Sequence, residues 1–227
     1  MSIYSNKFTS LEMTQFLGNL IPKPSRQIQV ALPGSSSILN CTPAQFSEIF
    51  NVAYSPWQRF TSEAFFNEVI GNCPWILQTR WGGELRLLGL KYRAEIQEGR
   101  VANLSIQWIN KKIGYGVFAQ QLLPPSFYIG EYTGRVRRLS RLHPDHNGYC
   151  FHYPTRFFSW KYFVIDALHE GNELRFINHS RSPNLTPAWA LDRGLLHLLL
   201  FTTRTVAKGE ELTFDYGEDY WLRRKEM

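Results

Sequence analysis

The chain has 227 residues, of which 44% are hydrophobic, and it carries a formal net charge of +6. This apolar content supports one substantial core or two small ones, and the lack of low-complexity or like-charge tracts argues against a disordered protein. No apolar stretch reaches the roughly 20 residues of a membrane span, and MSIYSNKFTS lacks the zones of a signal peptide. We therefore expect a soluble, folded protein whose basic charge favours acidic partners such as DNA.

The first 72 residues predict helices joined by Pro-rich connectors. Apolar residues recur at helical spacing near residues 9–20, 42–50 and 62–70, and Gly71 follows the third run. Thr42 and Gln45 have the spacing of a capping box, with a proline at the tolerated first position of the helix. We interpret these apolar stripes as packing faces.

After Pro74 the chain changes to short runs rich in β-branched and aromatic residues, separated by Gly and Pro. We predict strands in the runs at residues 75–81, 84–92, 103–109, 127–134, 161–167, 195–204 and 211–217. The gaps between them are too short for regular crossover helices, which argues against a doubly wound sheet. The sequence thus predicts an α+β protein in which a mostly β domain follows a small helical region.

The three cysteines, Cys41, Cys73 and Cys150, lack the number and spacing of a disulfide framework or a Cys-rich zinc site. We expect buried thiols in a reducing compartment, either the nucleus or the cytoplasm. His143 and His146 lie close to Cys150 in sequence, as does His152, but no helix is predicted that would put two histidines on one face. A polar loop is therefore a better interpretation than a metal site.

Gly114-Tyr115-Gly116 lacks the rest of a dinucleotide fingerprint or a P-loop, so by itself it predicts a corner between strands. Asn178-His179-Ser180 is more informative, because a polar triplet follows an apolar pair. It can be a capped turn with satisfied side chains or a binding segment, although the absence of a GxSxG elbow gives a serine hydrolase little support. Asp215-Tyr216-Gly217 ends an apolar strand, and Tyr216 can be a buried tyrosine with a hydrogen-bonded hydroxyl.

Four segments taken in order resemble the signature of the SET-domain protein-lysine methyltransferases. They are GYGVFA at 114–119, EYTG at 131–134, RFINHSRSPN at 175–184 and GEELTFDYG at 209–217. The resemblance also takes in 149–151 and 163–167. It divides the chain into an unassigned N-terminal region, a SET domain and a short basic tail, at residues 1–100, 101–221 and 222–227.

The resemblance implies a mostly β SET fold of small sheets, in which the RFINHS and DYG segments cross in a pseudoknot. It also implies S-adenosylmethionine as the methyl donor. The backbone of Gly114, Tyr115 and Gly116 would hold the donor's methionine end, and Asn178 and His179 its amino and adenine parts. Trp221 is our first candidate for stacking on adenine, with a core tryptophan as the alternative.

The resemblance further makes Tyr216 the catalytic tyrosine, assisted by Tyr132, and lines a narrow lysine channel with Tyr132, Tyr149, Phe214 and Tyr216. The lysine must arrive uncharged although its free pKa is about 10.4. A dry aromatic channel beside a positive sulfonium disfavours the ammonium, and no metal is required. A phenylalanine at 214 leaves out a hydroxyl that could hold water, which favours di- or trimethylation.

The chain departs from many relatives at Arg181, where they carry a zinc-binding cysteine, and no cysteine follows Gly217. We therefore expect no zinc-bound closing segment. Tyr220 and Trp221, the N-terminal helices, or the second subunit of a homodimer would then cover the site.

The resemblance implies a basic protein substrate, a histone or a histone-like protein, bound in an acidic groove. Acidic residues near the motifs could provide that groove: Glu131, Asp215, Glu218 and Asp219. A basic cluster could contact DNA phosphates or be a solvated loop: Arg135, Arg137, Arg138 and Arg141. Two other interpretations stay open, a methyltransferase for a non-histone protein and an inactive SET-like module that binds chromatin or a partner. A compact form without zinc segments would also suit a secreted effector acting on host chromatin.

Overall fold

The computed structural model describes residues 10–17, 26–35, 37–74, 82–139, 147–155, 161–218 and 220–221. The helices are α1 (Ser10–Phe16), α2 (Pro43–Phe50), α3 (Glu63–Gly71), α4 (Gly83–Lys91), α5 (Arg93–Glu98) and the 3₁₀ helix η3 (Glu173–Phe176). The strands are β1 (Ile28–Ala31), β2 (Leu39–Cys41), β3 (Ala53–Tyr54), β4 (Leu104–Asn110), β5 (Gly114–Ala119), β6 (Tyr128–Glu131), β7 (Arg135–Arg138), β8 (Cys150–Tyr153), β9 (Phe163–Asp166), β10 (Glu170–Gly171), β11 (Asn178–His179), β12 (Leu185–Asp192), β13 (Leu195–Thr202) and β14 (Glu211–Phe214).

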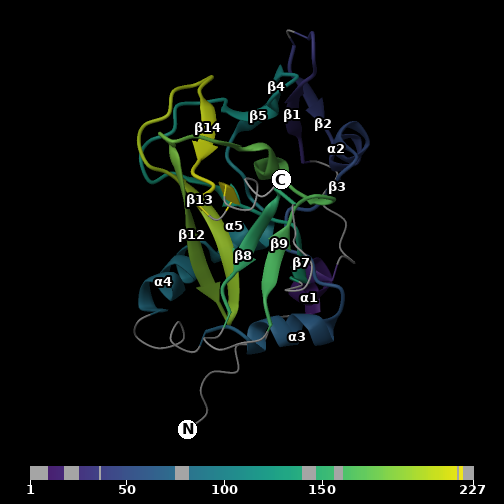
Figure 1. Ribbon diagram of the computed structural model, residues 1–227, viewed down its shortest axis with the longest axis vertical. Helices are drawn as coiled ribbons and strands as arrows, with labels where there is room; N and C mark the ends of the chain where they lie inside the picture. The colour runs from purple at the N-terminus through teal and green to yellow at the C-terminus, as the bar shows by residue number, and fades with distance from the viewer. Residues whose placement is uncertain are drawn as a thin grey trace.

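The strands form several small sheets (Figure 1). One has the order β11-β14-β5-β4-β1-β2, two others are β12-β13-β6 and β7-β9-β8, and β10 pairs with β3. The N-terminal strand β1 pairs in parallel with β4, so the first part of the chain extends the sheet that contains the GYG strand β5. The predicted fold class is confirmed, since small sheets dominate and helices α1 to α3 precede most of the strands.

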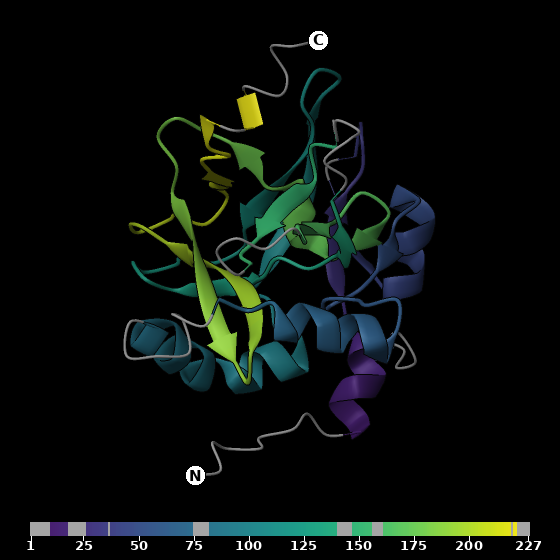
Figure 2. The same ribbon diagram turned by 60° about the horizontal axis from the view of Figure 1, so that its bottom comes forward.

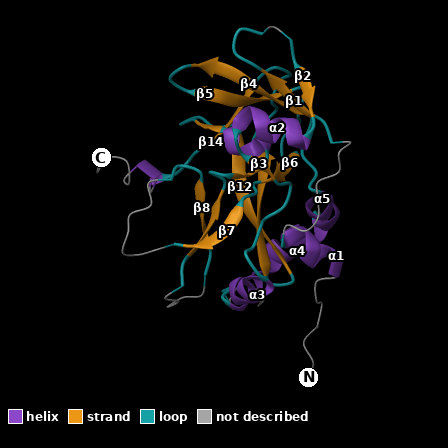
Figure 3. Cartoon of the chain, turned by 90° about the vertical axis from the view of Figure 1, so that its right-hand side faces the viewer, coloured by secondary structure: helices purple, strands orange, loops and turns teal. Residues whose placement is uncertain are grey.

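The helices gather mainly at one end of the molecule, away from the β1-β2-β4-β5 part of the large sheet (Figures 2 and 3). Helix α2 begins with the predicted capping box, in which the side chains of Thr42 and Gln45 each accept from the other's backbone N–H. Ser62 caps α3 in a similar way by accepting from the backbone N–H of Phe65. These two helices confirm the sequence prediction because their start signals are local.

The predicted strand at residues 84–92 is wrong, because this segment is helix α4. The run contains no β-branched residue and is rich in Leu, Glu, Arg and Lys, which favour helices. Its Gly89 lies so close to β12 that an added Cβ would be 2.2 Å from the carbonyl oxygen of Leu191. Strands β1 and β2 were not predicted, and the run at 75–81 lies outside the described residues.

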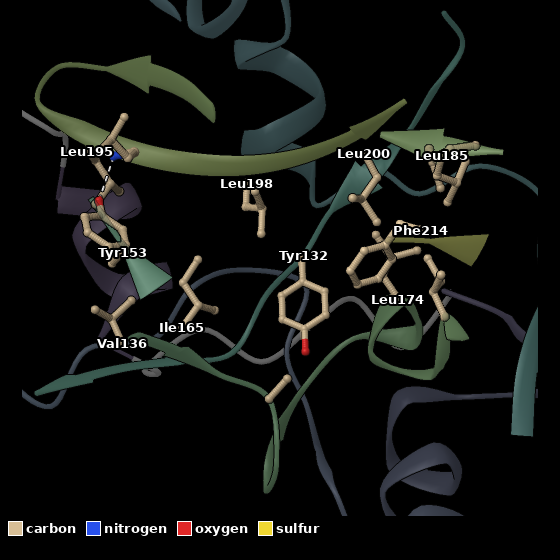
Figure 4. Close-up of a cluster of buried hydrophobic side chains, with 14 of the residues drawn as sticks. Tyr132, Val136, Tyr153, Ile165, Leu174, Leu185, Leu195, Leu198, Leu200 and Phe214 are labelled. Atoms are coloured by element: carbon tan, nitrogen blue, oxygen red, sulfur yellow. Dashed lines mark hydrogen bonds between the residues drawn. The ribbon is translucent and has the colours of Figure 1, made fainter. Parts of the chain in front are cut away.

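The main core surrounds β13, whose eight residues are all buried because it is the middle strand of β12-β13-β6. Figure 4 shows the ring of Tyr132 among Leu198, Leu200 and Phe214, with its hydroxyl pointing away from Leu198. The cysteines are free thiols, two of them buried and Cys150 half-buried. None of the described helices is long and apolar enough to cross a membrane.

Candidate active site

The two polar motifs of the sequence lie side by side. Strand β11 pairs in parallel with β14, with Asn178 opposite Thr213 and His179 opposite Phe214. The backbone N–H of Ser180 donates to the carbonyl oxygen of Phe214 at 3.2 Å. This pairing brings the residues that follow each strand together at one edge of the sheet.

A cavity of about 450 Å³ opens beside this edge, and we call it the tyrosine cavity. It is lined by Tyr132, Gly148, Tyr149, Cys150, Phe151, His152, Arg175, Ile177, Phe214, Tyr216, Gly217, Glu218 and Tyr220. Four parts of the chain form its walls, and each lies at the end of an element: the C-terminal ends of β6, η3 and β14, and strand β8 with the turn before it. All four residues predicted for the lysine channel are among them.

Aromatic rings follow one another along the wall of this cavity. The ring centroids of Tyr132 and Phe151 are 4.7 Å apart, and those of Phe151 and Phe214 are 5.4 Å apart. Phe214 lies 4.8 Å from Tyr216, which lies 4.5 Å from Tyr220. Such ring pairs at tilted and edge-to-face angles pack closely, so the wall is apolar and continuous.

Two tyrosine hydroxyls are held by backbone carbonyls. Tyr132 donates to the carbonyl oxygen of Tyr149 at 3.0 Å, and Tyr216 donates to that of Ile177 at 2.8 Å. Burial raises the pKa of Tyr132 well above its ordinary value, so this hydroxyl keeps its proton at neutral pH. The two phenols therefore have fixed orientations and remain hydrogen-bond donors.

A second cavity, of about 830 Å³, adjoins the first, and we call it the His179 cavity. It is lined by His179, Ser180, Arg181, Asp215, Gly217, Glu218 and Trp221. The two cavities share Gly217 and Glu218. The ring of Trp221 lies 4.9 Å from that of His179 and is 42% exposed, so it is not a core tryptophan.

Strand β5, which contains the GYG residues, is joined to strands β11 and β14 by the side chain of Asn178. The Asn178 side-chain amide donates to the carbonyl oxygen of Tyr115 at 3.1 Å and to Glu211 Oε1 at 2.8 Å. A Cβ at Gly116 would lie 2.7 Å from Glu211 Oε1 and 3.1 Å from Asn178 Nδ2, so only glycine fits without displacement. Among the described residues, the linings of the two cavities include His179 but not Asn178 or the GYG residues. Gly114 has a φ of +84°, which favours glycine.

The ring of Tyr115 faces the N-terminal part of the chain. Its centroid is 5.1 Å from that of Phe50 in α2 and 5.9 Å from that of Phe176 in η3. Phe50 and Phe176 are themselves 4.6 Å apart. Helix α2 therefore packs against residues from both the GYG and the RFINHS segments.

Among the residues that line the tyrosine cavity, sequence reasoning gave no role to Phe151 or Arg175, and it offered Tyr220 only as a cover for the site. Phe151 and Tyr220 complete its aromatic wall. Arg175 is 8% exposed, and its guanidinium carbon lies 4.1 Å from the centroid of the Tyr149 ring. Arg175 is part of the RFINHS motif, but only the tertiary structure shows that it is buried beside a cavity.

The structure corrects one residue of the expected acidic groove. Glu131 is 3% exposed, and its Oε1 lies 2.8 Å from His197 Nδ1 and accepts from Gln58 Nε2 at 2.9 Å. It is buried because it ends β6 next to the central strand β13. Asp215 and Glu218 are exposed at the cavities, and Asp219 lies outside the described residues.

The expected basic cluster is engaged within the chain. Arg135 pairs with Glu170 at 3.0 Å, and Arg137 pairs with Asp166 at 2.6 Å. Arg138 pairs with Glu68. These pairs favour the solvated-loop interpretation over a surface of free cations, and Arg141 lies outside the described residues.

The residues considered for a metal site are only partly described. His143 and His146 lie outside the described residues, while Cys150 and His152 line the tyrosine cavity. Within the described ranges, no group of three or more His, Cys, Asp or Glu side chains could hold a metal ion.

Comparisons with known proteins define the class of this site. Residues 114–217 match the SET domain family, a range that contains the GYG strand, η3, β11 and β14. The human histone-lysine N-methyltransferase EHMT1 is 33% identical over 131 residues, which cover 56% of this chain and 10% of the human protein. The Arabidopsis thaliana putative histone-lysine N-methyltransferase ASHH4 is 39% identical over 114 residues, which cover 47% of this chain and 31% of that protein.

Residues 114–217 therefore form a SET domain, and about half of the chain is similar to histone-lysine methyltransferases. The chain spans less than a third of the length of either relative. A crystal structure of KRYPTONITE in complex with mCHH DNA, H3(1-15) peptide and SAH is 33% identical to it in sequence. That match has a TM-score of 0.43 and covers 53% of this chain and 25% of the other.

Proposed function

We propose that this protein transfers a methyl group from S-adenosylmethionine to a lysine side chain of a protein. The observation that supports this most strongly is the pair of adjoining cavities. One has a continuous aromatic wall from Tyr132 to Tyr220, and the other is lined by polar groups and two aromatic rings. A lysine in the first cavity and a donor in the second would meet near Gly217 and Glu218, which line both.

The residues of the His179 cavity fit S-adenosylmethionine. The volume of about 830 Å³ lies in the range of small-molecule sites. The rings of His179 and Trp221 offer apolar faces to adenine, and the exposed carboxylates of Asp215 and Glu218 can accept from amino or hydroxyl groups. When bound, S-adenosylmethionine supplies an electrophilic methyl group on a positive sulfonium.

The tyrosine cavity prepares the amine for this transfer. Its aromatic wall excludes water, which disfavours the ammonium form of lysine and lowers its pKa. Tyr216 lines this cavity, so its hydroxyl would orient the nitrogen, and the faces of the rings would accommodate methylated ammonium by cation–π attraction. We assign catalysis to Tyr216 with Tyr132, and the lysine channel to these two with Tyr149 and Phe214.

The cofactor roles expected for the remaining motif residues are part of this proposal. Asn178 ties the backbone of Tyr115 to β14, which supports a role of Gly114, Tyr115 and Gly116 in shaping the donor side. The residues that follow Gly217 contribute Trp221 to the His179 cavity. A bound metal has no step in this reaction.

We propose a histone or histone-like protein as the substrate, because the curated relatives are named histone-lysine methyltransferases. The exposed Asp215 and Glu218 would favour the basic residues around the target lysine. Phe214 at the cavity wall supports di- or trimethylation. Such a substrate would place the protein at chromatin, in its own nucleus or in that of a host cell, close to DNA.

The test is transfer of radiolabelled methyl from S-adenosylmethionine to core histones and to a small basic bacterial protein. Wild type should label lysine, and Tyr216→Phe should lower turnover by about 100-fold or more while the cofactor dissociation constant changes by less than about threefold. Unchanged turnover in the variant would remove Tyr216 from the catalytic role.

The other outcomes separate the rival interpretations. If the cofactor binds but neither protein is labelled, the substrate is another protein. If the cofactor does not bind, the chain is an inactive SET-like module and the proposal is wrong.

A further inference from the structure

Arg175 is a buried cation that no described carboxylate pairs with directly. It lies in η3, is 8% exposed and lines the tyrosine cavity. Its Nε donates to the carbonyl oxygen of Ala167 at 2.7 Å, and its Nη2 donates to that of Leu168 at 3.1 Å. Carbonyl groups satisfy its hydrogen bonds but do not neutralise its charge.

Asp166, an acidic group that acts on Arg175, is already engaged with other partners. Asp166 accepts from Arg137 Nε at 2.6 Å, from Asn147 Nδ2 at 2.7 Å and from the backbone N–H of Leu168 at 2.9 Å. Burial lowers the pKa of Arg175 from its ordinary value, but a guanidinium stays protonated in proteins. Among the described residues, no carboxylate forms an ion pair with Arg175, so its positive charge acts on the tyrosine cavity with only the shared influence of Asp166 against it.

The same guanidinium supports the cavity wall. Its carbon lies 4.1 Å from the ring centroid of Tyr149 and 4.8 Å from that of Phe176. The backbone of Tyr149 accepts from the Tyr132 hydroxyl and from the N–H of Ala167, whose own carbonyl accepts from Arg175. Arg175 thus connects the ring and the backbone of Tyr149 to the loop after β9.

We propose that Arg175 is a positioning residue whose fixed positive charge makes the tyrosine cavity favour an uncharged amine over an ammonium, while its guanidinium plane holds Tyr149 in the cavity wall. This inference rests on the proposed methyltransferase function, because the amine is the entering lysine. A cation beside a second cation disfavours the charged form of that group, so Arg175 lowers the pKa of the lysine.

The other titratable groups of the cavity do not cancel this effect. They are Tyr132, Tyr149, Cys150, His152, Tyr216 and Glu218. Only Glu218 carries a negative charge in its ordinary form at neutral pH, and it is exposed, so water and salt screen it. The buried guanidinium is screened much less.

The first measurement is the pH dependence of kcat/KM for methyl transfer to core histones. In Arg175→Gln the pH at which kcat/KM reaches half of its maximum should rise by about one unit, because the lysine regains a higher pKa without the neighbouring charge. Arg175→Lys keeps the charge and should keep the half-maximal pH of the wild type. Arg135→Gln removes an exposed arginine outside the cavity and is the matched control.

The second measurement needs neither methyl transfer nor a cofactor. Cys150 lines the cavity, whereas Cys41 and Cys73 are buried, so alkylation by iodoacetamide reports the Cys150 thiol, and Cys150→Ser identifies that reaction. A positive charge stabilises the thiolate. Arg137 Nη2, which contacts Cys150 Sγ at 3.5 Å, stays in place in both variants. The pH of half-maximal alkylation rate should therefore rise in Arg175→Gln by the contribution of Arg175 alone, and should stay unchanged in Arg175→Lys. Near-UV circular dichroism checks that both variants are folded.

An alkylation curve that stays in place in folded Arg175→Gln would overturn the inference, as would an unshifted kcat/KM profile. If wild type labels no substrate, the proposed function fails by itself, and the alkylation curve still decides whether Arg175 sets the charge environment of the cavity.

Discussion

The tyrosine cavity and the His179 cavity adjoin, but their walls are stabilised differently. Tyr132 and Phe214 are each 3% exposed and belong to the main core, so the first cavity is built into the packed interior. The second is lined by exposed polar residues such as Arg181 and Asp215 and by Trp221, which is 42% exposed. The difference indicates that changes behind the tyrosine cavity cost stability, whereas changes at the His179 cavity cost binding.

The largest expected effect is on the support of the tyrosine cavity. Glu131→Leu should lower the free energy of unfolding by about 3 kcal/mol, because it leaves the buried His197 and Gln58 without their shared carboxylate. Urea unfolding measures this loss. Glu218→Leu removes an exposed carboxylate from the cavity edge and should change stability by less than about 0.5 kcal/mol. Equal losses in the two variants would contradict the comparison.

His179→Ala should affect binding more than stability. It removes the ring that contacts Trp221 and the Nδ1 that accepts from the backbone N–H of Tyr216 at 3.2 Å. We expect the dissociation constant for S-adenosylmethionine to rise about tenfold, which is about 1.4 kcal/mol. Isothermal titration calorimetry gives this value, with the exposed His169→Ala as the control. An unaltered affinity would separate His179 from the donor site.

Gly116→Ala tests the connection between the GYG strand and the site. The added Cβ would displace Asn178 and Glu211 from their mutual hydrogen bond. The cost in stability should be about 1 kcal/mol, and cofactor affinity should fall by roughly threefold to fivefold. Gly71→Ala, where nothing lies within 4 Å of the new Cβ, should lower neither quantity, and its stability should rise slightly because alanine favours the helix. A fully active, fully stable Gly116→Ala protein would show that the close packing at Gly116 has no functional consequence.

The smallest effect concerns acid stability near β14. The guanidinium of Arg204, 2.6 Å from Glu210, lowers the pKa of that carboxyl from 4.5 to about 2. A carboxyl with a lowered folded-state pKa contributes stability above its unfolded value and loses it as the pH falls from about 5 to about 2. Since the pair is partly exposed, Glu210→Gln should reduce this loss of stability at low pH by at most about 1 kcal/mol.

Thermal unfolding between pH 2 and pH 7 measures this contribution. Arg204→Gln removes the largest cause of the lowered Glu210 pKa, so it should also reduce the loss of stability at low pH. If the loss of stability at low pH stays unchanged in Arg204→Gln, the lowered pKa comes instead from the hydrogen bonds that Glu210 accepts from the backbone N–H of Ala207 and from Asn184 Nδ2.

Local patterns and family motifs were predictable from the sequence, whereas contacts between distant segments were not. The capping box at Thr42 was predicted because its donors and acceptors are three residues apart. Family motifs led to the choice of four residues for a lysine channel, and these four residues line one cavity. Helix α4 was misread because short apolar runs fit either type of element, although its lack of β-branched residues favours a helix.

The sequence by itself was sufficient to predict the mixed α+β class from its helix and strand patterns, and the four motif segments in order predicted the SET resemblance and four residues that line one cavity, Tyr132, Tyr149, Phe214 and Tyr216. Tertiary structure alone decided the parallel register in which β11 pairs with β14, the burial of Glu131 against His197, and the position of Arg175 beside Tyr149 with backbone carbonyls as its hydrogen-bond partners. The physical reason is the range of the interactions. Caps and motifs depend on near neighbours in sequence, whereas burial and charge compensation depend on contacts between segments far apart in the chain.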